Sequence, residues 1–102
     1  MVNVIATIEV VEGALKNYIK EFQLVRPLVL AEKGCVQYEV CIYNTTFNSL
    51  PTLVKPNTVV IMEKWETLED LDAHVKAEHM KQYREATKNL VSQRTLQVLS
   101  PV

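Results

Sequence analysis

The order in which hydrophobic periodicity changes along the chain is the feature that most constrains its fold. Apolar side chains alternate with a period of two in some runs and recur every three or four residues in others, which are the periods of strands and helices. Strands are predicted over 2–11, 35–43, 58–66 and 94–99, one helix over 14–33, and a helical region that starts at Thr67 and includes a second stretch over 78–91. This β-α-β-β-α-β order is that of the ferredoxin-like α+β fold, in which helices cover one face of an antiparallel sheet. With 102 residues, the chain is expected to form one domain over 1–102.

The second face of the predicted sheet indicates a partner. The first predicted strand carries apolar residues on both faces, with Val4, Ala6, Ile8 and Val10 on one and Ile5 and Val11 on the other. A sheet with helices on one side only would leave its other apolar face in water, whereas a second copy can cover that face by packing sheet on sheet. The chain is therefore predicted to form a homodimer.

Charge and hydropathy argue against several classes of partner. The net charge is −1 and no cluster of Lys or Arg is present, so nucleic acid is not expected to bind. No apolar run approaches the ~18 residues that a membrane-spanning helix needs. The first seven residues lack the basic region that begins a signal peptide, so no export is expected.

The two cysteines indicate a reducing compartment. Cys35 and Cys41 lie in one predicted strand, on the same face but ~20 Å apart, which is too far for a disulfide bond. Reduced thiols favour a cytoplasmic protein. No neighbouring base or positive charge is evident for either thiol, so both are interpreted as inert. The Cys and His residues also lack the close pairing of zinc ligands, so no metal site is predicted.

Several local signals predict where the helices begin and end. Gly34 is expected to take a left-handed conformation after the first helix, and Pro27 to kink that helix or end its regular part. Thr67 is expected to cap the next helix, with Asp70 three residues later in a pattern like a capping box. The buried stripe of that helix is predicted to be Leu68, Leu71 and Val75. Spacings of three and four predict one apolar stripe on the first helix, made of Leu15, Tyr18, Ile19, Phe22, Val25 and Val29.

The segment 44–57 is predicted to be a long loop with a role of its own. It contains two prolines and shows no clear period, and its 14 residues exceed the usual length of a connection. It is also too apolar for a purely solvated loop, since it contains Phe47, Leu50, Leu53 and Val54. A lid over a pocket and a contact with a partner subunit are both compatible with this composition.

The main candidates for chemistry lie in one short stretch. Trp65, the only tryptophan, ends the third predicted strand, and both histidines follow at His74 and His79. Histidine titrates near neutral pH and can act as a general base, and tryptophan can line an aromatic pocket. Each residue also has a structural interpretation. Trp65 could be a core side chain, His74 a half-exposed residue at the flank of the apolar stripe, and His79 a capping or core residue.

Further residues could contact a substrate. Tyr38 and Tyr83 are candidate hydroxyl donors, and Met62 and Phe47 are candidate apolar lining residues, although packing or an interface explains all four equally well or better. Glu63 shares a predicted strand face with Trp65, so it would be covered and would need a partner. That partner could be Arg94 or Lys64 of a second copy, and the carboxylate could serve a dimer contact or a pocket.

With this architecture in place, the chain resembles the antibiotic-biosynthesis-monooxygenase domains along nearly its whole length. The similarity rests on Glu32-Lys33-Gly34-Cys35 with Tyr38, on Glu63-Lys64-Trp65-Glu66, on Leu71-Asp72-Ala73-His74 and on His79-Met80-Lys81. The run Glu78-His79-Met80-Lys81-Gln82-Tyr83, the long loop before the third strand and the ending Leu96-Gln97-Val98-Leu99-Ser100-Pro101 are similar to the small bacterial quinol monooxygenases of the YgiN type.

The resemblance implies a dimeric α+β barrel that oxidises a quinol or related aromatic phenol with O2 and without a cofactor. Trp65 would then form the pocket wall, and His74 or His79 would be the base. The only glycines are Gly13 and Gly34, so the chain has no Gly-rich cradle for the phosphates of a flavin or nicotinamide.

The same domain family carries other activities, and two alternatives stay open. One is isomerisation of a small oxygenated ketone, and the other is a non-enzymatic dimer that binds quinones or other aromatics. The polyketide-type monooxygenases have a Tyr and an Asn where this chain has Leu71 and Ile61, so those substrate contacts are not carried over. Haem-degrading members use an Asn well inside the first strand, where this chain reads Ile5-Ala6-Thr7-Ile8, and haem chemistry is disfavoured.

Overall fold

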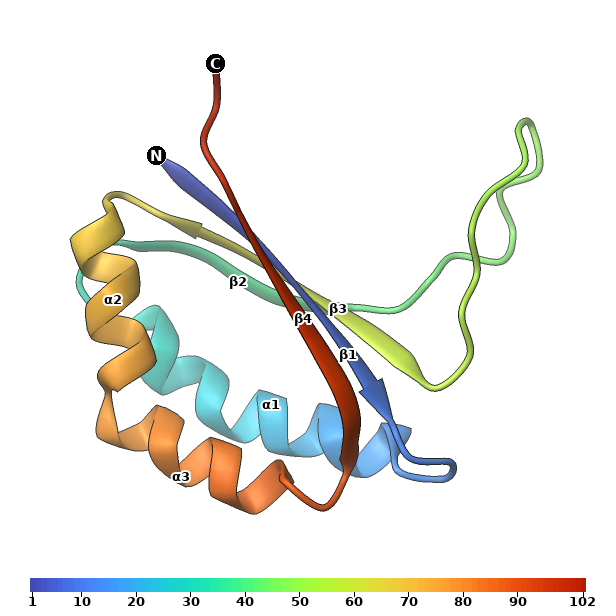
Figure 1. Ribbon diagram of the computed structural model, residues 1–102, viewed down its shortest axis with the longest axis horizontal. Coiled ribbons are helices and arrows are strands. Elements are labelled where there is room, and N and C mark those ends of the chain that lie inside the picture. Colours follow the sequence, from blue (N-terminus) through green and yellow to red (C-terminus); the bar gives the residue numbers. More distant parts are fainter.

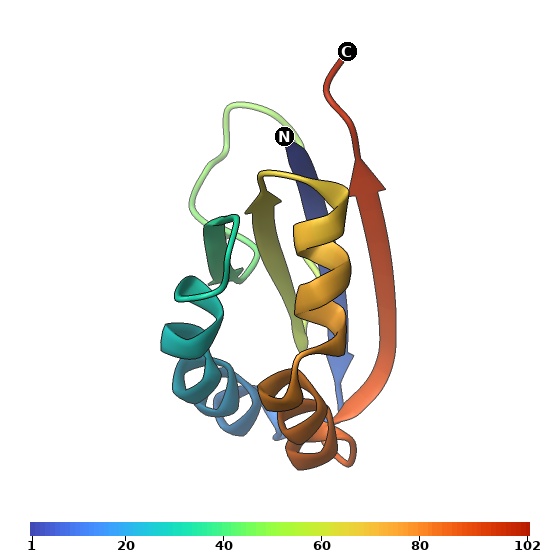
Figure 2. The ribbon, with the colours of Figure 1, turned by 90° about the vertical axis from the view of Figure 1, so that its left-hand side faces the viewer.

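A computed structural model describes all residues from 1 to 102 and confirms the βαββαβ order of a ferredoxin-like fold. The elements are β1 (Val2–Val10), α1 (Leu15–Leu30), β2 (Cys35–Cys41), β3 (Thr58–Trp65), α2 (Leu68–Lys76), α3 (Glu78–Thr87) and β4 (Val91–Leu99). The four strands form one antiparallel sheet in the order β2-β3-β1-β4. All three helices lie on the same face of this sheet, and the opposite face is bare (Figures 1 and 2). None of these helices has both the length and the hydrophobicity that a bilayer-spanning segment needs.

The core fills the space between the sheet and the helices. Every second residue of β1, from Val2 to Val10, is buried on this side. Helix α1 contributes Tyr18, Phe22, Val25 and Val29 at helical spacing, as the sequence predicts. The Phe22 ring stacks on the Tyr38 ring of β2, with centroids 4.8 Å apart. The alternation in β1 and β3 therefore sets which side chains can face a pocket beneath the helices.

The element boundaries differ from the prediction by three or more residues at two places in the chain, and elsewhere by one or two residues. Helix α1 contains Pro27 and ends at Leu30, three residues early, because the backbone N–H of Glu32 bonds to the Val29 carbonyl in a tighter turn. The second helical stretch ends at Thr87 and β4 begins at Val91, where a helix to 91 and a strand from 94 were expected. Pairing with β1 decides this second boundary, since it recruits Val91 and the residues after it into the ladder.

A bulge in β2 corrects the prediction that Cys35 and Cys41 share a face. The ladder between β2 and β3 pairs Cys35 with Trp65 but already pairs Gln37 with Lys64, so one extra residue is accommodated on β2. The bulge turns Cys35 towards the helices, where it packs against the core, while Cys41 keeps the register of the bare face. Neither thiol forms a disulfide bond.

The buried side of α2 also differs from its predicted stripe. Leu71 is buried, but Leu68 and Val75 are exposed, and the other buried residues are Asp70 and His74. Polar contacts fix this rotation of the helix. The Thr67 hydroxyl accepts a hydrogen bond from the Asp70 backbone N–H at 3.0 Å, which confirms the predicted cap, and the Asp70 side chain lies against the turn at Gly34.

The predicted loop between β2 and β3 is present and projects away from the sheet and the helices (Figure 1). Its apolar side chains, Phe47, Leu50, Leu53 and Val54, are all exposed in the single subunit. At its start, the Asn44 side chain accepts hydrogen bonds from the backbone N–H groups of Thr46 and Phe47, at 2.9 Å and 2.8 Å. The loop thus has local order and an apolar surface that its own subunit does not cover.

Gly34 and Gly13 offer a matched test of how the turn after α1 is fixed. Both have positive φ, of 79° and 85°, but a Cβ added at Gly34 would overlap the Asp70 carboxylate, whereas nothing lies near Gly13. Gly13→Ala is expected to cost about 1–2 kcal/mol of unfolding free energy for the left-handed conformation. Gly34→Ala is expected to cost about 1–3 kcal/mol more because of the overlap.

Urea unfolding of the two variants measures these costs. The Asp70 Cβ would itself lie 2.7 Å from the added Cβ, so only Asp70→Gly removes the whole overlap. In the double variant Gly34→Ala/Asp70→Gly the additional cost should largely disappear, which a double-mutant cycle quantifies. Equal losses of stability in the two single variants would contradict the proposed contact between Gly34 and Asp70.

Candidate active site

A mostly apolar cavity lies between the sheet and helices α2 and α3. Its volume is about 190 Å³, and 11 of its 15 lining residues are hydrophobic. An engineered apolar cavity of about 150 Å³ holds benzene in another protein, so this space suits one aromatic ring with small substituents. The lining residues are Val4, Ala6, Ile8, Tyr18, Tyr38, Ile61, Glu63, Leu71, His74, Val75, Met80, Tyr83, Arg84, Arg94 and Leu96. Few polar groups therefore reach this space, and each can orient a ligand.

His74 reaches the cavity from α2 and contacts Glu32, Trp65 and Tyr38. It is only 3% exposed and lines the cavity, so the alternative interpretation of His74 as a half-exposed residue is wrong. Its Nδ1 lies 2.9 Å from a Glu32 carboxylate oxygen, and its ring centroid lies 4.6 Å from that of Trp65 and 5.5 Å from that of Tyr38. Because a carboxylate can only accept, the bonded Nδ1 carries a proton, and in the neutral ring Nε2 keeps its lone pair.

Glu32 joins the two histidines. The same oxygen that accepts from His74 also lies 2.7 Å from His79 Nε2. The side chain of Glu32 is 13% exposed and that of His79 is 23% exposed, compared with 4% for His74. The three groups thus form a continuous polar chain from the protein surface to the cavity wall. Sequence reasoning assigned no role to Glu32, because it lies in the turn after α1 and meets the histidines only through the fold.

Glu63 faces the other side of His74. Its carboxylate accepts a hydrogen bond from the Trp65 indole N–H at 2.9 Å, and the same oxygen is 3.9 Å from His74 Nε2. The indole is therefore a partner of Glu63 within the chain, and Arg94 of the same chain forms no ion pair with Glu63. Burial raises the pKa of Glu63, while the bond from Trp65 and the nearby His74 pull the pKa back down.

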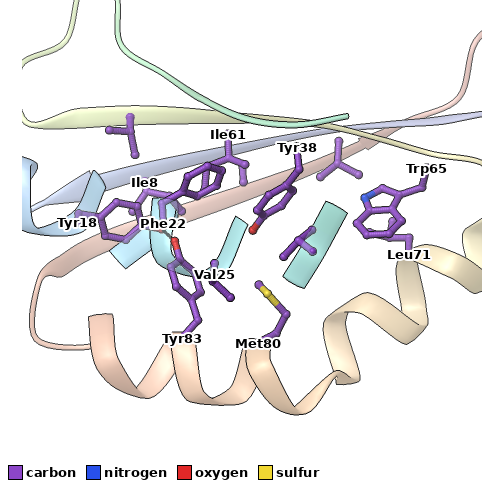
Figure 3. Close-up of a cluster of buried hydrophobic side chains, with 14 of the residues drawn as sticks. Ile8, Tyr18, Phe22, Val25, Tyr38, Ile61, Trp65, Leu71, Met80 and Tyr83 are labelled. Atoms are coloured by element: carbon purple, nitrogen blue, oxygen red, sulfur yellow. Dashed lines mark hydrogen bonds between the residues drawn. The ribbon is translucent and has the colours of Figure 1, made fainter. Parts of the chain in front are cut away.

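Three tyrosines bring hydroxyl groups to the cavity. The Tyr83 hydroxyl, directed from α3 towards α1 in Figure 3, donates to the Tyr18 hydroxyl. The Tyr38 hydroxyl also lies at the cavity and forms no hydrogen bond within the chain. Burial is the main cause that raises the pKa of all three hydroxyls, so each stays protonated near neutral pH and can donate. Tyr18 was recognised only as part of the helical stripe.

The other predicted site residues do not line the cavity. Trp65 is fully buried, with its ring against His74 and its indole N–H on Glu63, and His79 contacts Glu32 rather than the cavity. Met62 projects from the bare face of the sheet and Phe47 lies in the projecting loop. No group of three or more His, Cys, Asp or Glu side chains is arranged to hold a metal ion.

The raised pKa of Glu63 predicts a pH-dependent difference in stability. Because the folded state holds this proton more tightly than the unfolded state, the stabilisation is present below the ordinary pKa of 4.5 and is lost as the pH rises through the raised pKa. Gln does not ionise, so the Glu63→Gln variant does not lose this stabilisation as the pH rises, and its amide oxygen can still accept from the Trp65 indole. Its unfolding free energy should therefore increase relative to the wild type as the pH rises from 4.5 towards neutral.

Denaturant unfolding at a series of pH values measures this difference. The variant Glu12→Gln, which changes an exposed carboxyl group outside the site, is the control. A stability difference between Glu63→Gln and the wild type that stays constant or reverses over this range would contradict the prediction.

Comparison with known proteins gives a consistent result. The family model described as "Antibiotic biosynthesis monooxygenase" matches residues 1–86. The chain is 33% identical over 106 aligned positions to the Escherichia coli K12 protein named "Probable quinol monooxygenase YgiN", and the alignment covers 99% of this chain and 98% of that protein.

Solved structures share the fold at lower identity. A Nitrosomonas europaea protein titled as an antibiotic biosynthesis monooxygenase matches with a TM-score of 0.84 and 14% identity, over 100% of this chain and 99% of that one. PA3566 from Pseudomonas aeruginosa matches with a TM-score of 0.81 and 20% identity, over 99% and 93% of the two chains. The family match covers most of the sequence, and the alignment to the Escherichia coli protein covers both chains almost completely. The chain therefore belongs to the antibiotic biosynthesis monooxygenase family.

Proposed function

We propose that this protein is a cofactor-independent monooxygenase that oxidises a quinol or related aromatic phenol, with His74 as the general base. The observation that carries the proposal is the placement of His74 at an apolar cavity, with Nδ1 fixed by Glu32 at 2.9 Å and Nε2 directed towards Glu63. The family and the name of the Escherichia coli relative support this choice of reaction.

The first step is removal of a phenolic proton. His74 Nε2 takes the proton from the ring hydroxyl, and the positive charge that forms is stabilised through Nδ1 by the Glu32 carboxylate. The apolar lining excludes water, which strengthens these interactions. The Tyr38 hydroxyl has no partner in the chain and can donate to a substrate oxygen as negative charge develops there. Tyr83 lines the other end of the same cavity.

The oxidation then balances between the substrate and one molecule of O2. The phenolate transfers one electron to O2, and the resulting radical pair joins at a ring carbon to form a peroxide. The outer peroxide oxygen takes the phenolic proton back from His74. The ring carbon then loses its hydrogen as a proton while the O–O bond breaks, which leaves a carbonyl on the ring, and the departing hydroxide combines with that proton to form water. The quinol thus supplies all four electrons that O2 accepts and becomes a hydroxyquinone, so no external reductant enters the balance.

Trp65 acts in this proposal through its neighbours rather than as a pocket wall. Its indole N–H holds Glu63 and its ring packs on His74. His79 takes a similar positioning role through Glu32, and it offers the proton a route from His74 towards solvent. Both residues then influence the base without touching the substrate.

Isomerisation of a small oxygenated ketone is the second candidate. Such a reaction would use the same His74 to move a proton between carbons without O2. Two arginines, Arg84 and Arg94, line the cavity and could hold an anionic group of such a substrate. Requirement for O2 distinguishes the two reactions.

The proposed enzyme is a homodimer in which the bare sheet face is covered. This face carries Met62 on β3 and Ile5 on β1, and the exposed apolar loop with Phe47 projects beyond it. A second copy would bury these side chains by sheet-on-sheet packing, which places Met62 and Phe47 in the interface rather than at the substrate.

Light scattering at micromolar concentration tests the dimer. The expected mass is twice the 11.7 kDa of the chain. Met62→Lys and Phe47→Glu should shift the equilibrium towards the monomer, because each places a charge where apolar burial is proposed. A monomeric mass for the wild type would contradict the homodimer.

The role of His74 is tested by oxygen uptake with metal-free protein and reduced menadiol or smaller hydroquinones, after subtraction of autoxidation in buffer. His74→Gln should lower kcat by about 10²–10⁴-fold, the usual contribution of a general base, and change KM much less. Glu32→Gln should also lower kcat, because it weakens the hold on Nδ1. His79→Gln should have the smallest effect of the three, since His79 contacts only Glu32.

Thermal melts of each variant show whether the fold is retained. Retention of the wild-type kcat in a folded His74→Gln variant would remove His74 from the mechanism. Turnover that continues without O2 would instead favour the isomerase.

A further inference from the structure

The cavity has a second polar end, remote from His74. In the sheet, Glu63 lies opposite Val4, whereas Arg94 lies opposite Ile8 on the other side of β1. These two positions of β1 are four residues apart, which is ~13 Å along a strand. The acidic end at Glu63 and the basic end at Arg94 are thus separated along the length of the cavity.

Arg94 has no protein partner at this end. No carboxylate lies within ion-pair distance of its guanidinium, and it forms no hydrogen bond within the chain. Arg84, which also lines the cavity, donates only to the Val75 carbonyl, at 3.0 Å. Both arginines therefore line the cavity without an ion pair to a carboxylate, and its one acidic lining residue, Glu63, lies at the opposite end from Arg94.

The tyrosine pair leaves a further donor unused. Tyr18 and Tyr83 are both buried and together supply two hydroxyl protons, of which one is spent between them. The second proton has no acceptor in the chain. A buried O–H group without an acceptor is costly, and a ligand oxygen would satisfy it. Arg94 pairs with Ile8 in the sheet, and Tyr18 and Tyr83 lie near Ile8 and far from Trp65 in Figure 3. All three side chains line the cavity, so the Arg94 guanidinium and the tyrosine pair form one donor cluster at this end.

We propose that this cluster binds a carboxylate on the substrate, so that the preferred ligand is a phenol with a carboxylate on the opposite side of the ring. The proposal rests on the proposed function, because the phenolic end is the end that reacts at His74. Arginine can bind a carboxylate through two parallel hydrogen bonds, and the free tyrosine hydroxyl adds a third donor. A benzene ring with substituents in para positions is the simplest aromatic shape that presents one polar group to each end of the cavity.

The position of Arg94 keeps the cost of binding such an anion low. Arg94 and Leu96 are exposed on the edge strand β4, whereas Val4, Ile61 and His74 are buried. The carboxylate would therefore stay at the partly solvated mouth of the cavity while the ring enters its apolar part. A charged group that is paired and still partly hydrated avoids the desolvation penalty of full burial.

Binding to two nearly isosteric ligands tests the proposal. Quenching of Trp65, the only tryptophan, reports ligands beside His74, and the probes are 4-hydroxybenzoate and the neutral 4-hydroxybenzamide. The wild type should bind the acid at least about tenfold more tightly than the amide. Arg94→Gln should abolish this preference and leave binding of the amide within about twofold, and Arg94→Lys should retain part of the preference.

The control variant is Lys20→Gln, which removes the same charge from an exposed position of α1 outside the cavity. It should keep the preference for the acid, which separates a local contact from a change in net charge. Thermal melts verify that each variant is folded. Equal affinity of the wild type for acid and amide would overturn the proposal, and so would a preference that survives Arg94→Gln.

Binding preference and oxygen uptake test the carboxylate site and the proposed reaction separately. Oxygen-dependent turnover of neutral hydroquinones without any preference for the acid would overturn the carboxylate site and leave the monooxygenase intact. A preference that depends on Arg94, with no oxygen uptake for any phenol, would support the site and reject the monooxygenase. Tighter binding of phenyl phosphate than of 4-hydroxybenzoate would overturn the carboxylate assignment in favour of a phosphate.

Discussion

The structure of the site depends on the contact between Glu32 and His74. Glu32 lies in the turn after α1 and His74 on α2, so the 2.9 Å bond joins two elements that are 42 residues apart in the chain. Removing Glu32 would leave Nδ1 of the buried His74 without its acceptor, at a cost of about 1–3 kcal/mol, whereas removing His74 would leave Glu32 with His79 as its partner. The bond thus helps to set the rotation of α2 about its axis and, through that rotation, the direction in which the base faces. Asp70 supports the same rotation by packing against Gly34 one turn earlier on the helix.

This dependence on a contact between distant residues explains why more of the fold than of the site could be predicted from the sequence. Alternation in β1 and β3 and the helical stripe of α1 depend on local sequence and hydrophobic burial alone, so their faces were correctly predicted. The rotation of α2 was not, because the hydrophobic rule assigned Leu68 and Val75 to the core and could not weigh two buried polar contacts made with a distant turn. The bulge that moves Cys35 to the helix side is likewise a matter of how two strands pair, and nothing in the β2 sequence signals it.

The same difference between local patterns and contacts of distant residues explains which site residues could be predicted. His74, Tyr38 and Tyr83 were found from sequence because their residue types carry chemistry and their positions fall on periodic faces. Glu32, Tyr18 and Arg84 were missed because each looks ordinary where it stands: a charged turn residue, a core aromatic and a charged residue on a surface helix. Their roles arise because α1 and α3 meet at one cavity and the turn before β2 meets His74 at its wall, and only the packing of the helices on the sheet creates these contacts.

The two polar ends of the cavity also bear on the energetics of the proposed reaction. Forming a phenolate in an apolar space requires positive charge close to it, because the anion loses the hydration that stabilises it in water. When His74 takes the proton, the imidazolium provides that charge at the reacting oxygen, and Glu32 behind it keeps the new cation from being isolated. A carboxylate at the far end would add a second negative charge and would disfavour the phenolate unless it were neutralised. Arg94 at that end would provide the neutralisation, so the contact that selects the substrate would also keep the substrate acidic enough to react.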